Sequence, residues 1–186
     1  MKCYDEYASG YDAWFMKNAN LLASEVKLVA RTLADGGEIL SIGCGSGLME
    51  SMLKRDFGIV VADGVEPSPG MAEIARKRGL NVLPAAAADF PVMRQYDTVL
   101  MNGCPSYIDD LDAAFAHAAE ALKPGGRLVV ADVPKESAYA GPEFASEADR
   151  VEAVMDRLAR EHPEFQPEMD KAVAAGTRQE LEYWKA

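Results

Sequence analysis

Three glycines alternate with other residues directly after a short apolar run, in ILSIGCGSG over residues 39–47. Glycine is used where the backbone bends sharply or where another group must approach it closely. Further along, Glu66 follows a second apolar stretch, in GVEPSPGMAEIAR. A carboxylate at the tip of a second strand can accept hydrogen bonds from ribose hydroxyls. Gly43, Gly45, Gly47 and Glu66 therefore predict a site that binds a nucleoside.

Two classes of nucleoside cofactor are bound by such a turn. The dinucleotide fingerprint G-x-G-x-x-G places its third glycine beside a pyrophosphate. Here the sixth position is Leu48, and the glycines follow the spacing G-x-G-x-G. This spacing favours a ligand without a pyrophosphate over a nicotinamide dinucleotide. Asp63 is the alternative acid for the ribose.

Apolar periodicity predicts the elements that position these residues. Helices are expected at residues 4–15, with an interruption at Gly10, and at 20–34. Strands are expected at 38–43, 59–65, 81–84, 97–102 and 127–133. Three more helices are expected at 48–56, 69–78 and 110–122. Strands separated by helix-length segments predict an α/β fold with a doubly wound, mostly parallel sheet and helices on both faces. Ser68 is expected to cap the helix that begins at Pro69.

The C-terminal part of the chain predicts two more helices, at about 146–160 and 164–175, and one short strand within 177–186. We expect a single domain over residues 1–186. In it, 1–34 forms an N-terminal helical lid, 38–133 the cofactor-binding core, and 134–186 the C-terminal helices with a short edge strand.

Composition argues against several classes of function. The formal net charge of −11, the pI of about 4.6 and the lack of a local basic patch argue against partners such as nucleic acid or an anionic membrane. Cys3, Cys44 and Cys104 have no CxxC spacing, which argues against a zinc cluster and a disulfide framework. No apolar run reaches the length of a membrane span, and we expect a cytoplasmic location.

Four segments of the chain carry a resemblance to a known family. EILSIGCGSG, VEPSPGMAEIAR, YDTVLMNG and LKPGGRLVVAD occur in this order. They resemble the cofactor loop, the ribose-binding segment, the fourth strand and the turn into the fifth strand of class I S-adenosylmethionine (SAM)-dependent methyltransferases of the small-molecule type 11 kind. The resemblance spans about residues 4–133. It implies a Rossmann-like fold, SAM as cofactor, S-adenosylhomocysteine (SAH) as product and a small-molecule substrate.

The resemblance also implies roles for single residues. Gly43 and Gly45 would lie against the methionine moiety, Met71 would pack on the adenine, and the Asn102 carbonyl would receive the amino group of SAM. Tyr11 is similar to a lid residue that closes over the cofactor carboxylate. Amphipathic packing explains Tyr11 and Met71 as well. The cofactor-binding residues predicted in this way are Tyr11, Gly43, Cys44, Gly45, Gly47, Glu66, Pro67, Met71, Ala87, Ala88, Asn102 and Gly103.

The chain departs from the family pattern at two places. In AAAADFPV, Ala86 stands where the family has an Asp that meets the adenine amino group. We interpret Asp89 as structural and expect the backbone amides of Ala87 and Ala88 to address the adenine. The second departure is the short C-terminus. Either one strand of the family's sheet is missing, or another chain completes the strand pair, or the edge of the sheet stays open. A homodimer through this edge is therefore one expectation.

No residue is predicted as a catalytic base or a metal ligand. Methyl transfer from a sulfonium is an in-line displacement with a good leaving group, which requires positioning of the nucleophile and no metal. A base is needed only for a nucleophile that keeps its proton, such as an alcohol. His117 and His162 are interpreted as surface or packing residues, and Cys104 and Tyr107 as candidates for the pocket wall.

Two alternative functions stay open. A SAM- or SAH-binding protein that senses a metabolite without chemistry is slightly favoured by Ala86, by the small number of candidate bases and by the short C-terminus. An NAD-dependent oxidoreductase is disfavoured by Leu48.

Overall fold

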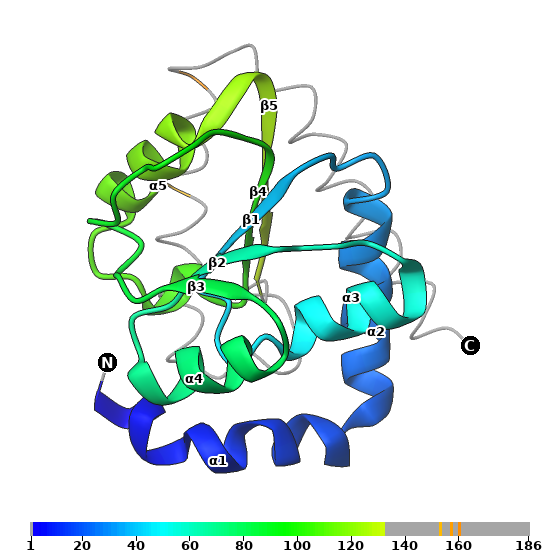
Figure 1. Ribbon diagram of the computed structural model, residues 1–186. Helices are drawn as coiled ribbons and strands as arrows, with labels where there is room; N and C mark the ends of the chain where they lie inside the picture. Colours follow the sequence, from blue (N-terminus) through cyan, green and yellow to red (C-terminus); the bar gives the residue numbers. More distant parts are fainter. Residues whose placement is uncertain (1, 133–152, 154–156, 158–159, 161–186) are drawn as a thin grey trace.

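The structure is a computed structural model that describes residues 2–132, 153, 157 and 160. Its centre is a five-stranded parallel sheet in the order β3-β2-β1-β4-β5 (Figure 1). The strands are β1 (Ile39–Ile42), β2 (Asp63–Val65), β3 (Asn81–Leu83), β4 (Tyr96–Asn102) and β5 (Leu122–Ala131). The chain extends the sheet to one side of β1 and then returns to the other side. The predicted doubly wound parallel sheet is thus confirmed.

The helices follow the apolar periodicity closely. They are α1 (Lys2–Lys17), α2 (Ala19–Thr32), α3 (Leu48–Phe57), α4 (Pro69–Lys77) and α5 (Leu111–Glu120), with a short 3₁₀ turn η1 (Pro105–Tyr107). The expected cap of α4 is confirmed, because the Ser68 hydroxyl accepts a hydrogen bond from the Met71 N–H at 3.3 Å. The interruption expected at Gly10 is wrong, since α1 runs through it. A mid-helix glycine costs roughly 1 kcal/mol, which packing of α1 against α2 and α4 can offset.

Two strands differ in extent from the prediction. β2 is shorter than 59–65 because its register places only Asp63–Val65 opposite β1. β5 begins at Leu122 and not at 127, since Leu122 already pairs with Tyr96 across a register shift. Residues 123–126, the KPGG segment, form the irregularity between these pairings.

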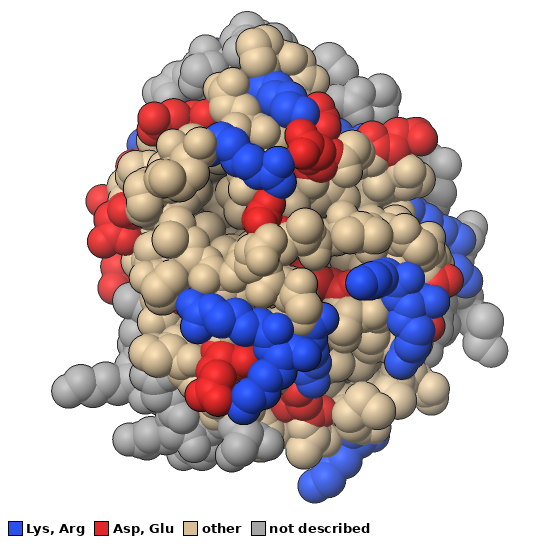
Figure 2. Space-filling model, viewed as in Figure 1, with Lys and Arg blue, Asp and Glu red and all other residues tan. Residues whose placement is uncertain are grey.

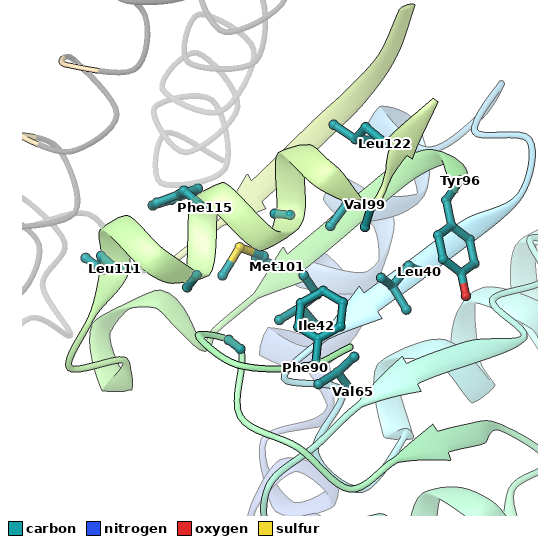
Figure 3. Packing of buried hydrophobic residues seen from close by; sticks show 14 residues of the cluster. Leu40, Ile42, Val65, Phe90, Tyr96, Val99, Met101, Leu111, Phe115 and Leu122 are labelled. Carbon is teal, nitrogen blue, oxygen red and sulfur yellow. The ribbon is translucent and has the colours of Figure 1, made fainter. Parts of the chain in front are cut away.

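Side chains that alternate along a strand pack against helices on opposite faces of the sheet. Leu40 and Ile42 of β1 pack on the side of α5, in a cluster with Met101 and Phe115 (Figure 3). Ile39 lies on the opposite side, in a cluster formed mainly by residues of α2 and α3. Period-two alternation along β1 explains this division, and the prediction of helices on both faces is confirmed.

The described residues leave part of the C-terminal prediction open. The helices expected at 146–160 and 164–175 and the strand within 177–186 lie outside the described residues, except that Ala153, Arg157 and Arg160 are helical. Arg157 forms an ion pair with Asp112 of α5. Within the described part of the chain, β5 pairs only with β4. The homodimer through this edge and the single-domain organisation stay predictions.

The structure also bears on membranes and metals. Among the described residues, no helix combines the length and apolar character needed to span a bilayer. The same residues contain no group of three or more His, Cys, Asp or Glu side chains arranged to hold a metal ion.

Candidate cofactor site

The glycine turn connects β1 to α3 at the carboxyl edge of the sheet. Gly43, Gly45 and Gly47 have φ values of +69°, +54° and +72°, which residues with a Cβ rarely adopt. A Cβ at Gly43 would lie 2.6 Å from the Cys104 Cβ, and one at Gly47 would lie 3.2 Å from Ala75 of α4. A Cβ at Gly45 would meet no atom of the described residues within 4 Å. Two of the glycines therefore permit close packing, whereas Gly45 borders open space that a ligand can occupy.

Glu66 connects this turn to the next helix. It directly follows β2, and only 8% of its surface is exposed. Its Oε2 accepts a hydrogen bond from the Gly45 N–H at 2.9 Å, and its Oε1 accepts one from the Ser68 N–H at 2.8 Å. The acid and the glycine turn, predicted from separate segments, thus lie in direct contact at the carboxyl ends of β2 and β1, next to the point between β1 and β4 where the strand order reverses.

Helix α1 is attached to the same turn by polar contacts. The Asp12 carboxylate accepts a hydrogen bond from the Ser46 hydroxyl at 2.6 Å and forms an ion pair with Arg78, at the end of α4. Arg78 Nη1 also donates to the Ser46 carbonyl at 2.7 Å. Asp12 was not among the predicted site residues. Its position beside Tyr11 was the only signal in the sequence that could have identified it.

Tyr11 lies in an acidic environment. Burial raises the pKa of Tyr11 to about 12, and Glu25, Tyr107, Asp12 and Glu66 all contribute to the increase. The phenol therefore stays protonated at neutral pH. Tyr11 precedes Asp12 on α1, and Asp12 accepts the hydrogen bond from Ser46 of the glycine turn. The structure thus brings the predicted lid residue to the glycine turn.

Asn102, the last residue of β4, meets a helix that no motif included. Its Nδ2 donates a hydrogen bond to Glu25 Oε1 of α2 at 3.2 Å. Its Oδ1 is buried and has no hydrogen-bond partner among the described residues. Burial raises the pKa of Glu25, and the nearby carboxylate of Asp132 raises it further. Asp132 itself accepts hydrogen bonds from the backbone N–H and the hydroxyl of Ser106, at 3.1 and 2.9 Å.

Other predicted residues lie in the packing around the turn. Met71 is 2% exposed at the start of α4, and Cys44 packs in an apolar cluster with Ala72 and Ala75. Burial raises the pKa of the Cys44 thiol, so it is kept protonated and unreactive. Pro67 lies between Glu66 and the cap of α4.

The remaining predicted residues lie in two loops, Ala87 and Ala88 before β4 and Gly103 directly after it. Ala87 is buried in the cluster beneath α5, whereas Ala88 is partly exposed. Asp89 closes the local turn, because its Oδ1 accepts a hydrogen bond from the Ala86 N–H at 3.2 Å. Gly103 has a φ of +60° and donates its N–H to a carbonyl of β5.

Residues considered for catalysis have mostly structural surroundings. The Cys104 Sγ donates to the Ile42 carbonyl at 3.2 Å, and burial raises the pKa of its thiol. On α5, the centroid of the His117 ring lies 5.4 Å from the centroid of the Phe90 ring. Tyr107 is half exposed. His162 lies outside the described residues.

Lys and Arg side chains gather over α4, as Figure 2 shows. Lys77 forms an ion pair with Glu73 and Arg78 with Asp12, while Arg76 donates to a backbone carbonyl. These contacts engage the basic groups within the fold. The cluster therefore gives no support to a nucleic-acid partner.

A cavity of about 300 Å³ lies at the opposite, amino edge of the sheet, lined by residues that include Asp97, Lys123 and Arg127. Lys123 is already paired with Asp97 and Glu38, at 3.1 and 2.8 Å. Ligands of doubly wound sheets bind beyond the carboxyl ends of the strands. The glycine turn is therefore the better candidate for the functional site.

Comparisons with known proteins identify the family of the chain. The sequence model of the family described as "Methyltransferase domain" matches residues 14–173. The chain therefore belongs to this family, and the predicted class, the SAM-dependent methyltransferases with a Rossmann-like fold, is confirmed. An uncharacterized protein of Methanocaldococcus jannaschii is 31% identical over 138 residues, which cover 74% of this chain and 64% of that protein.

Two relatives have more informative names. A demethylmenaquinone methyltransferase of Tropheryma whipplei is 30% identical over 170 residues, covering 86% of this chain and 68% of the relative. The crystal structure of a SAM-dependent methyltransferase of Thermotoga maritima, described as a possible histamine N-methyltransferase, superimposes with a TM-score of 0.66 and 35% identity. That match covers 74% of this chain and 63% of the Thermotoga chain. The described fold is thus that of a methyltransferase, whereas the chain spans only part of its relatives' length.

Proposed function

We propose that this chain transfers a methyl group from SAM to a small-molecule nucleophile at the glycine turn. The hydrogen bond from the Gly45 N–H to Glu66 carries this proposal. It brings a carboxylate against a sharply bent backbone at the carboxyl ends of β1 and β2, beside the switch point of the sheet, where nucleoside ligands of such folds bind. A carboxylate oxygen accepts more than one hydrogen bond. Glu66 can therefore be oriented by backbone amides and still address ribose hydroxyls.

The residues present fit SAM. Glu66 would hold the ribose, the open side of Gly45 would face the methionine moiety, and Met71 would border the adenine. Tyr11, held by α1, would close over the amino-acid end as a neutral phenol. When bound, SAM supplies a methyl group on a sulfonium whose departure leaves a neutral thioether. The contribution of the chain is to orient the acceptor against that methyl group and to keep water out.

The charges around Tyr11 support an uncharged or cationic acceptor. The ionisable groups that act on Tyr11 are the carboxylates of Glu25, Asp12 and Glu66 and the phenol of Tyr107. An anionic acceptor would be repelled by these carboxylates. The described residues offer no evident base, which favours a nucleophile that has a lone pair without losing a proton at the site, such as an amine in its neutral form. The Thermotoga relative is described as a possible histamine N-methyltransferase, and histamine is an amine.

Calorimetric titration with SAH and with NAD tests the proposed cofactor, using two glycine variants. Gly45→Ala places a methyl group in the open space next to the turn. Gly58→Ala is the matched control, because Gly58 also has a positive φ, of +70°, and an added Cβ there meets no described atom within 4 Å. We expect SAH binding to weaken at least about tenfold in Gly45→Ala and to be unchanged in Gly58→Ala. Comparable affinity for NAD, or normal SAH binding by Gly45→Ala, would contradict the proposal.

Turnover requires a separate measurement. The chain is incubated with SAM and a panel of small amines, alcohols and carboxylic acids, and SAH formation is measured. We expect SAH to form with at least one amine. Tight SAH binding without turnover of any acceptor would support the non-catalytic, metabolite-sensing alternative.

A further inference from the structure

Glu50 is a buried acid without a counter-ion among the described residues. It lies in the first turn of α3, and only 3% of its surface is exposed. Its Oε1 accepts a hydrogen bond from the Ser41 hydroxyl at 2.6 Å, whereas its Oε2 is buried and has no hydrogen-bond partner among those residues. None of the ion pairs in the described part of the chain includes Glu50. A buried carboxylate in such surroundings is unfavourable, so the group is stable when it is protonated or when a cation binds nearby.

The contact with Ser41 places this acid at the base of the glycine turn. Ser41 is in β1, two residues before Gly43, and Glu50 is three residues after Gly47. Their hydrogen bond therefore joins the strand that enters the turn to the helix that leaves it. Both residues are buried, so the carboxyl lies within the fold behind the turn. A ligand on the open side of the turn therefore meets the charge of Glu50 and not its oxygen atoms.

Two structural roles explain part of this arrangement. The positive end of the α3 dipole favours an acid in its first turn, and the hydrogen bond to Ser41 attaches α3 to β1. For the attachment, glutamine would serve equally, since its carbonyl oxygen accepts the same hydrogen bond. Only a carboxyl, however, can change its charge when a charged ligand binds.

SAM and SAH differ in charge at the sulfur. SAM has a positive sulfonium that joins the ribose to the methionine moiety, and SAH has a neutral thioether at the same place. With the ribose at Glu66 and the methionine moiety at Gly45, the sulfur would lie at the turn, because the Gly45 N–H donates to Glu66. An interaction between charges needs no contact, and it is screened less in a protein interior than in water. An ionised Glu50 would therefore stabilise bound SAM much more than bound SAH.

We propose that Glu50 distinguishes SAM from SAH by charge: its carboxyl releases a proton to solvent when SAM binds at the glycine turn, and keeps the proton when SAH binds. This role rests on the proposed function, since it requires the cofactor at the turn. After methyl transfer the sulfur is neutral, and Glu50 would be a buried carboxylate without a cation until it takes up a proton from solvent. Glu50 would in this way favour binding of SAM over retention of the product.

The groups around Glu50 agree with a protonated state before SAM binds. Burial raises the pKa of Glu50, hydrogen bonds and Arg78 lower it, and Glu66 raises it further. Burial also raises the pKa of the thiols of Cys44 in the turn and Cys104 after β4, so both are neutral. The side chains that α2, which packs on α3, buries are apolar. A proton is therefore available for release near neutral pH.

Calorimetric titrations in two buffers of different ionisation enthalpy, phosphate and Bis-Tris, measure the protons released on binding. At about pH 6.5 the ammonium and carboxylate groups are ionised in both SAM and SAH, so they contribute little. We expect most of a proton to be released for each SAM bound, and none for SAH. Glu50→Gln should release none with either ligand, and it should bind SAM about fivefold more weakly and SAH normally. Glu73→Gln, which removes an exposed carboxylate from α4, is the matched control and should behave like the unmodified chain.

The outcomes separate this inference from its foundation. Equal weakening of SAM and SAH by Glu50→Gln would show a structural role only. Release of a proton on SAM binding that persists in Glu50→Gln would assign the proton to another group. Either result overturns the inference, as does equal release with SAM and SAH or no release with SAM.

A second variant keeps the test open if Glu50→Gln does not fold. Ser41→Ala removes the hydrogen bond that stabilises the charge of Glu50. It should therefore reduce the proton release on SAM binding, and unchanged release would overturn the inference. Failure of the unmodified chain to bind SAM and SAH would instead refute the proposed function.

Discussion

Replacing Glu66 by glutamine is the most direct test of how the site is built. The carboxylate accepts one hydrogen bond from the Gly45 N–H and one from the Ser68 N–H. Glutamine has the same shape, but one of its two terminal groups is an NH₂, which cannot accept a hydrogen bond from an N–H. One backbone N–H would therefore face a donor in place of an acceptor.

The expected loss of stability follows from these two contacts. A hydrogen bond to a charged acceptor contributes about 1.5–3 kcal/mol, and Glu66→Gln removes one of them and the charge from the other. Glu66 is 8% exposed, so part of this loss is offset because a charge no longer has to be buried. We expect the free energy of unfolding of the ligand-free chain to fall by about 2 kcal/mol. SAH binding should weaken by a further ten- to hundredfold, roughly, since the ribose loses its charged acceptor.

Urea unfolding, followed by circular dichroism, measures the first effect without ligand. Calorimetric titration with SAH, at a temperature where the variant is folded, measures the second. Glu73→Gln is the matched control, because Glu73 lies on α4 near Glu66 but is exposed and pairs only with Lys77 among the described residues. It should change neither measurement. Unfolding of Glu66→Gln at the same urea concentration as the unmodified chain would refute the idea that Glu66 holds the turn.

Two further predictions concern charged groups near the turn. Asp12→Asn removes the ion pair with Arg78, in which both side chains are about a quarter exposed, and should lower the free energy of unfolding by about 1 kcal/mol. Amide hydrogen exchange in α1 should become faster while exchange in β1 is unchanged. Exchange in α1 at the same rate as in the unmodified chain would contradict this prediction. Burial raises the pKa of Glu50, so the folded chain binds a proton at this carboxyl more readily than the unfolded chain does. The free energy of unfolding therefore falls as the pH rises above the ordinary pKa of a glutamate. Glu50→Gln should therefore match the unmodified chain near pH 4 and become more stable than it toward about pH 8, as measured by urea unfolding; a constant difference across this range would refute it.

The sequence predicts the elements well where local pattern and tertiary structure agree. The apolar runs of β1 and β4 and the capped start of α4 are recognisable because each depends on neighbouring residues. The early start of β5 depends on the pairing of Leu122 with Tyr96, which is a contact between distant segments. The continuity of α1 through Gly10 likewise reflects its packing on other helices, which local propensity does not contain.

The site was predictable only in part for a related reason. A motif identifies Glu66, but only the fold shows that both of its oxygens accept backbone hydrogen bonds. Asp12 and Glu25 lie on amphipathic helices, where the pattern indicates a polar face. It does not indicate which polar residue of that face meets a partner such as Asn102. Residue roles that depend on long-range contacts therefore required the structure.

The two N-terminal helices, predicted together as a lid, differ in how they are held. α2 buries Leu22, Val26 and Val29 in the core, and each such side chain contributes about 1.5–3 kcal/mol, so α2 cannot leave the sheet without unfolding the domain. On α1, Trp14 and Met16 are more than half exposed, and the contacts with the glycine turn and Arg78 are polar. We therefore expect any opening movement to be confined to α1. Tyr11 would then move with α1, whereas Glu25 of α2 would stay in contact with Asn102.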